Sequence, residues 1–152
     1  MSGFRAREQM RGHHEFHDGW GPAGRLPFAF RVSWGPDRVR DWLDPRKPSF
    51  LWNALEGEVR AGGLCDWTPC GGTLHLQYFP ERRIRYDFGF EVDGRSFRYV
   101  GDKVNLRWWN LAVTHTTCHG VLTEQATGRL VSTGTTLFHL RDLPRLLAIR
   151  RV

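Results

Sequence analysis

The chain has 152 residues, 40% of them hydrophobic and 25% charged, with a formal net charge of +6. This is the composition of an ordinary globular domain, and the absence of any run of about 20 apolar residues predicts no membrane-spanning helix. Most of the positive charge is arginine, but it is scattered over every segment, so we do not expect a nucleic-acid-binding surface. Three cysteines and a charged start without an apolar segment favour a cytoplasmic protein, folded as one domain over residues 1–152.

Between the glycines and prolines, apolar residues mostly alternate with polar ones, which is the pattern of half-buried β-strands. In chain order, strands are expected at 10–20, 26–34, 55–64, 72–79, 82–92, 96–101, 111–122 and 128–140. The clearest is RRIRYDFGFEV, in which Ile84, Tyr86 and Phe88 share one face and an Asp-Gly turn follows. Two stretches have helical spacing instead, 37–45 and the basic C-terminal stretch 141–152.

Eight or nine strands with two short helices predict an all-β, mainly antiparallel protein. We favour a closed lipocalin- or calycin-like barrel over a two-sheet sandwich, because closure of long strands removes exposed sheet edges. One short internal helix and one short C-terminal helix complete the expected fold. A barrel of this size either fills its interior with side chains or holds one small ligand.

Several short elements follow one another in a set order: M-R-G at 10–12, P-F at 27–28, L-E-G at 55–57, G-G at 71–72, R-Y at 85–86, G-D-K at 101–103 and T-T at 116–117. Together they resemble the small β-rich domain associated with actinobacterial GMC oxidoreductases of the cholesterol-oxidase kind, over about residues 8–122. The resemblance implies a calycin-like barrel connected with lipid or steroid metabolism, and an oxidoreductase as a partner. The chain departs from that pattern at Thr114, where the family tends to carry an acidic residue. No G-x-G-x-x-G flavin fingerprint occurs at an expected strand-to-helix turn either, so no catalytic residue carries over and no cofactor is expected.

The stretch LAVTHTTCHGVL, residues 111–122, combines two histidines with a cysteine. As a strand it directs Cys118 and His119 to opposite faces, so they cannot form a thiolate–imidazole pair. His115 and His119 share a face but lie about 13 Å apart, at about 3.3 Å per residue, which is too far for one metal ion. One inward side chain therefore remains from this stretch, either His115 or Cys118.

Metal binding is considered at two further places and expected at neither. In HHEFH (13–17), the two histidines and the glutamate that share a face are about 6.6 Å apart and diverge, so we expect them to be solvated. His14, on the opposite face, is expected to line the interior. Cys65 and Cys70 in GLCDWTPC are expected to lie in a loop as free thiols, although a disulfide between them is stereochemically feasible.

The leading functional hypothesis is the binding of a hydrophobic small molecule inside the barrel, such as a lipid, a steroid or a polyketide-like compound. Burial of apolar ligand surface would supply the affinity, at about 25 cal/mol per Å² before costs. The expected lining consists of aromatic side chains and a few polar groups: His14, Phe28, Phe30, Tyr78, Phe88, Tyr99, Trp108, Trp109 and Thr117. The tryptophan pair in this set is expected either to cover one barrel end or to form a satellite core under a loop.

Two alternatives stay open at the level of sequence. The first is a cofactor-independent isomerase or cyclase in which His115 or Tyr86 acts as a general acid or base on the enclosed molecule. The second is an interaction module whose basic C-terminal helix docks on an acidic partner or a membrane surface. A homodimer is compatible with each of these hypotheses.

Overall fold

The computed structural model describes residues 3–77, 82–104, 117–138 and 150–151. In these parts of the chain, nine antiparallel strands form a single sheet. They are β1 (Phe4–Phe16), β2 (Arg25–Trp34), β3 (Trp52–Ala61), β4 (Cys65–Gln77), β5 (Arg83–Val92), β6 (Arg95–Lys103), β7 (Thr117–Glu124), β8 (Leu130–Phe138) and β9 (Arg150–Arg151). The single described helix, α1 (Val39–Trp42), lies between β2 and β3.

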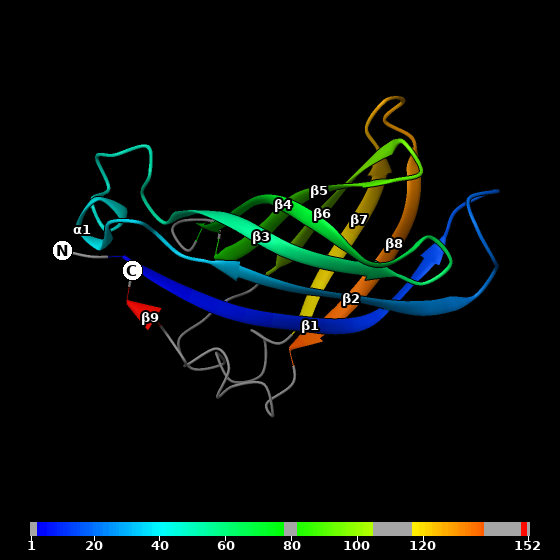
Figure 1. Cartoon of the computed structure of the whole chain (residues 1–152), viewed down its shortest axis with the longest axis horizontal. Coiled ribbons are helices and arrows are strands. Elements are labelled where there is room, and N and C mark those ends of the chain that lie inside the picture. Colours follow the sequence, from blue (N-terminus) through cyan, green and yellow to red (C-terminus); the bar gives the residue numbers. More distant parts are fainter. Residues whose placement is uncertain (1–2, 78–81, 105–116, 139–149, 152) are drawn as a thin grey trace.

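The sheet closes on itself to form an eight-stranded barrel (Figure 1). Strands β2 to β8 follow one another in sequence order, and β1 lies between β8 and β2. The closing pair runs from Ala6 opposite Trp34 to Glu15 opposite Arg25. Closure pairs the strand edges that an open sheet would expose, and the predicted antiparallel barrel is confirmed.

The helices differ from the prediction. The internal helix is a single turn, Val39–Trp42, rather than the whole stretch 37–45, because none of its residues is buried and packing therefore does not extend it. The predicted C-terminal helix over 141–152 is wrong at its end, where residues 150–151 form β9. This short strand pairs with Phe4 and Arg5 of β1, which lie beyond the part of β1 that β8 covers. Residues 141–149 lie outside the described part of the chain.

The expected loop around the two nearby cysteines is also wrong. Cys65 and Cys70 both belong to β4, and both are free thiols. The register between β3 and β4 shifts between Val59 and Ala61, and Trp67 has a φ of 33°. The strand pairing is therefore irregular near the two cysteines, as at a β-bulge. Pairing with β3 keeps the segment extended.

Aromatic rings fill the middle of the barrel. Phe30 lies 5.3 Å from Tyr86, 5.3 Å from Phe88 and 5.6 Å from Tyr99, measured between ring centroids. Tyr99 has room because Gly120 faces it: a Cβ atom on Gly120 would lie 2.2 Å from the tyrosine ring. Alternation on β2, β5 and β6 therefore builds the core, as the sequence pattern predicts.

The two ends of the barrel differ. At one end, which we call the Trp20 end, the strands are joined across 17–24, 62–64, 93–94 and 125–129. There Trp20 packs edge-on against Phe97, with ring centroids 6.2 Å apart, and the guanidinium carbons of Arg95 and Arg129 each lie 5.9 Å from its ring. At the opposite end, which we call the Glu8 end, β2 is joined to β3 by the longer stretch 35–51, which contains α1.

Candidate functional site

Four side chains from four strands meet inside the barrel toward the Glu8 end. The carboxylate of Glu8 on β1 accepts a hydrogen bond from the ammonium of Lys103 on β6 at 2.6 Å. The Tyr86 hydroxyl on β5 lies 2.8 Å from both carboxylate oxygens, and the Trp34 indole N–H on β2 donates to Oε2 at 3.3 Å. We call these four residues the Glu8 cluster.

The Glu8 cluster is shielded from water. The Glu8 side chain is 4% exposed and that of Lys103 is 6% exposed. Removing two charges from water costs several kcal/mol per ion, and their mutual attraction offsets this only when further hydrogen bonds complete the geometry. Glu8 has these further bonds from Tyr86 and Trp34. The Lys103 ammonium also lies 5.2 Å from the Tyr86 ring centroid, on the electron-rich face of a π-system.

Burial and the neighbouring carboxylate affect the titration of the phenol. Burial is the largest cause that raises the pKa of Tyr86 well above its ordinary value of 10.0, followed by the charge of Glu8. At neutral pH the phenol is therefore protonated and acts as a hydrogen-bond donor. The Glu8 cluster thus combines one acceptor carboxylate with three donors, an arrangement suited to holding or polarising an oxygen atom.

Two other polar groups lie inside the barrel. The Tyr99 hydroxyl lies 3.6 Å from the Cys118 sulfur, near the middle. Burial raises the pKa of Cys118 to about 11, so this thiol is neutral and unreactive as a nucleophile at neutral pH. Toward the Trp20 end, one ring nitrogen of His14 lies 2.9 Å from the Ser132 hydroxyl and the other 2.9 Å from the Gly62 carbonyl oxygen. Burial lowers the pKa of His14, so its imidazole is neutral and satisfied.

The residues predicted for the site divide into three groups. Six are inside the barrel and at most 2% exposed: His14, Phe28, Phe30, Tyr86, Phe88 and Tyr99. Thr117 is half-buried and on the opposite face of β7 from the buried Cys118, so the structure places it on the outside of the barrel. His115, Tyr78, Trp108 and Trp109 lie outside the described residues. Of the two inward candidates on this strand, Cys118 points inward, with no part of it exposed.

Sequence reasoning missed Glu8 and Trp34 as members of an interior site. The sequence does contain an indication of this position. Glu8 lies an even number of residues from Met10 and His14, so in an extended strand it shares the face that was expected to point inward. The expected strand begins at residue 10, whereas β1 begins at Phe4, so Glu8 lies in a part of the strand that the sequence pattern does not identify. The partner that makes burial tolerable, Lys103, lies 95 positions further along the chain.

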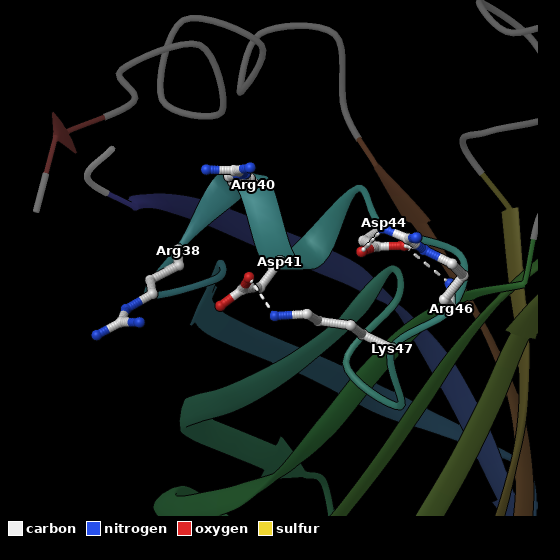
Figure 2. Close-up of a pocket in the computed structure, with 6 residues that line it drawn as sticks. All are labelled: Arg38, Arg40, Asp41, Asp44, Arg46 and Lys47. Atoms are coloured by element: carbon white, nitrogen blue, oxygen red, sulfur yellow. Dashed lines mark hydrogen bonds and ion pairs between the residues drawn. The ribbon is translucent and has the colours of Figure 1, made fainter.

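A solvent-exposed pocket of about 670 Å³ lies around α1, on the connection between β2 and β3 (Figure 2). Its walls are charged: Arg38, Arg40, Asp41, Asp44, Arg46 and Lys47. Lys47 donates to Asp41 at 2.6 Å, and Arg46 donates twice to Asp44 at 3.0 Å, which lowers the pKa of both carboxyl groups. Water competes with these exposed interactions, so the shielded Glu8 cluster is the stronger candidate site.

Comparison with known protein families, with curated proteins and with solved structures found no match to this chain. The resemblance to the oxidoreductase-associated domain therefore stays a prediction. Within the described part of the chain, no three His, Cys, Asp or Glu side chains are grouped so that they could hold a metal ion. No helix among the same residues is long and apolar enough to cross a membrane.

Proposed function

We propose that this protein is a lipocalin-like barrel that binds one hydrophobic small molecule at the Glu8 end. The observation that carries the proposal is the Glu8 cluster itself, a buried group of one carboxylate and three donors inside a closed barrel. Binding sites for small molecules combine apolar walls with a few fixed polar groups that orient the ligand. Here the apolar walls would be the side chains of Val32, Leu55 and Leu74, which are buried on neighbouring strands.

The distribution of side chains supports the Glu8 end over the middle of the barrel. Phe28, Phe30 and Phe88 pack around Tyr99 with ring centroids 5.0 to 5.6 Å apart, so rings already occupy the centre. At the far end Trp20 packs on Phe97. The ligand would therefore rest on the ring layer and direct its polar group toward the Glu8 cluster. The apolar lining supports a lipid, steroid or polyketide-like compound as the ligand we propose.

The test uses native mass spectrometry of the purified protein and titration with Nile red, a neutral dye that fluoresces in apolar sites. We expect either a co-purified organic mass or saturable Nile red fluorescence at one site per chain. Tyr86→Phe, in the Glu8 cluster, should weaken dye binding at least fivefold. Tyr99→Phe is the matched control, because this buried phenol contacts a thiol instead of the carboxylate and should leave binding within twofold. Absence of both organic mass and dye signal in the wild-type protein contradicts the proposal.

An enzyme on the same barrel is the second candidate, favoured by the direct contact between the Tyr86 phenol and the Glu8 carboxylate at 2.8 Å. In a cofactor-independent isomerase, the substrate carbonyl oxygen would replace Glu8 as the acceptor of the Tyr86 O–H, and Glu8 would remove a proton from one side of the carbonyl group and return it to another carbon of the resulting enol. This activity would incorporate deuterium from D₂O beside the carbonyl of a ketone, which mass spectrometry detects. Glu8→Gln should abolish the exchange. The predicted role of His115 is tested in the same assay with His115→Asn.

A further inference from the structure

The Glu8 cluster carries information about the charge of the ligand. Glu8 and Lys103 form an ion pair at 2.6 Å, and both side chains are at most 6% exposed. The two opposite charges cancel, so the cluster is electrically neutral as a unit. A ligand with its own charge would add an unbalanced charge to a shielded site, which burial penalises strongly.

In the Glu8 cluster, the acceptor carboxylate has most of its hydrogen-bonding positions filled by the described residues, whereas the donor ammonium does not. The Glu8 carboxylate receives donors from Lys103, Tyr86 and Trp34, and so has little capacity left for a ligand donor. An ammonium group carries three donors. Among the described residues, Glu8 is the one hydrogen-bond acceptor that Lys103 contacts. Within the described part of the chain, the spare capacity of the cluster is therefore that of a donor, located on Lys103.

A neutral unit with spare donors selects an uncharged acceptor. We infer that the ligand presents a carbonyl oxygen, as in a ketone, an aldehyde or an ester, to the ammonium of Lys103, and that carboxylates are rejected. This inference rests on the proposed function, because it names the chemical class of the polar group of the ligand bound there. A carbonyl oxygen accepts hydrogen bonds and carries no net charge, so it matches the cluster in both respects.

The experiment compares two competitors of nearly equal shape, tridecan-2-one and dodecanoate, which differ by a methyl group in place of a charged oxygen. Each displaces Nile red from the wild-type protein and from Glu8→Gln. We expect the wild type to bind the ketone at least tenfold more tightly than the carboxylate. In Glu8→Gln the positive charge of Lys103 is no longer balanced, so the preference should shift toward dodecanoate by at least tenfold.

Two controls separate recognition from loss of structure. Glu58→Gln removes a carboxylate that pairs with Arg31 on the outer surface, and should leave the ketone preference unchanged. The double variant Glu8→Gln/Lys103→Met removes both charges and keeps the cluster neutral. It replaces Glu8→Gln in the displacement experiment if that single variant does not fold. It should still bind Nile red, with weaker ketone binding and no gain for dodecanoate.

The outcomes distinguish the two proposals. Equal displacement of Nile red by ketone and carboxylate, with the same ratio in Glu8→Gln, overturns the carbonyl inference and leaves hydrophobic ligand binding in place. If Nile red does not bind the wild-type protein and no organic mass co-purifies, the proposed function fails, and the inference fails with it. A ketone preference that Glu8→Gln reduces and Glu58→Gln retains supports both.

Discussion

Glu8 lies inside the barrel with its carboxylate held by donors from three other strands, Trp34 on β2, Tyr86 on β5 and Lys103 on β6. Four apolar side chains of the same volume would avoid the cost of desolvating two charges. The buried ion pair is therefore not explained by a contribution to stability. The ion pair does link strands β1 and β6, which are distant along the chain. The ion pair therefore orients the donors of the cluster, at a stability cost that its hydrogen bonds partly offset.

Single and double substitutions of the ion pair should depart from simple additivity. Lys103→Met leaves the Glu8 carboxylate buried without its counter-ion and should lower the free energy of unfolding by about 3–5 kcal/mol. Glu8→Gln/Lys103→Met removes both charges and should be more stable than Lys103→Met, which urea unfolding measures. Glu58→Gln, which breaks the exposed pair with Arg31, should cost about 1 kcal/mol or less. A double variant no more stable than Lys103→Met would contradict this account.

His14 should make the stability of the protein depend on pH below neutrality. Burial lowers its pKa below the ordinary value of 6.5, so the folded protein holds the imidazole neutral while the unfolded chain takes up a proton. This group stabilises the fold fully above pH 6.5, and the contribution is lost as the pH falls through 6.5 toward the lowered folded pKa. Urea unfolding at pH 7 and pH 5 should show that the free energy of unfolding decreases more for the wild type than for His14→Gln. Equal decreases would show that His14 does not titrate differently in the two states.

At the level of strands, alternation carried most of the prediction. It identified the inward faces of β2 and β5, because Phe28, Phe30, Tyr86 and Phe88 follow the period of two without interruption. It failed at the start of β4, where a loop was expected around Cys65 and Cys70 but pairing with β3 keeps the chain extended. β9 could not be predicted from its own residues, since its extended form depends on the free edge of β1. The Glu8 cluster could not be assembled either, because its members come together only when the barrel closes.

The contact between Gly120 of β7 and the Tyr99 ring should make this glycine intolerant of substitution. A Cβ atom there would lie 2.2 Å from ring atoms of Tyr99, so Gly120→Ala must displace a buried ring and should cost about 1–3 kcal/mol or more. Gly71→Ala on β4 is the matched control, because its nearest neighbour would be the Leu55 carbonyl oxygen at 3.8 Å. Thermal unfolding compares the two. Similar losses for both variants would show that strand glycines in general, and not this contact, limit stability.

Across the whole molecule, as far as the structure describes it, the interior holds four weak acids in their neutral form. Burial raises the pKa of Cys118 to about 11 and that of Cys70 to about 12, above the ordinary thiol value of 9.0. The pKa values of Tyr86 and Tyr99 are also raised well above 10.0, chiefly by burial. None of the four can ionise without either entering water or placing a charge inside the closed barrel. The barrel therefore couples their titration to global unfolding.

Alkaline pH should consequently unfold the protein cooperatively. Above pH 9 the unfolded chain loses thiol protons that the folded barrel retains, so the stability is complete below pH 9 and falls as the pH rises through 11. Each tenfold difference in proton affinity between the folded and unfolded thiol contributes about 1.4 kcal/mol to this loss. Urea unfolding at pH 8, 9, 10 and 11 should show this decline, and Cys118→Ala should flatten it. Tyrosinate absorbance at 295 nm, followed in Tyr78→Phe so that Tyr86 and Tyr99 alone contribute, should appear together with loss of the fold. A gradual rise in absorbance from a folded barrel would instead show that water reaches these phenols in the native state.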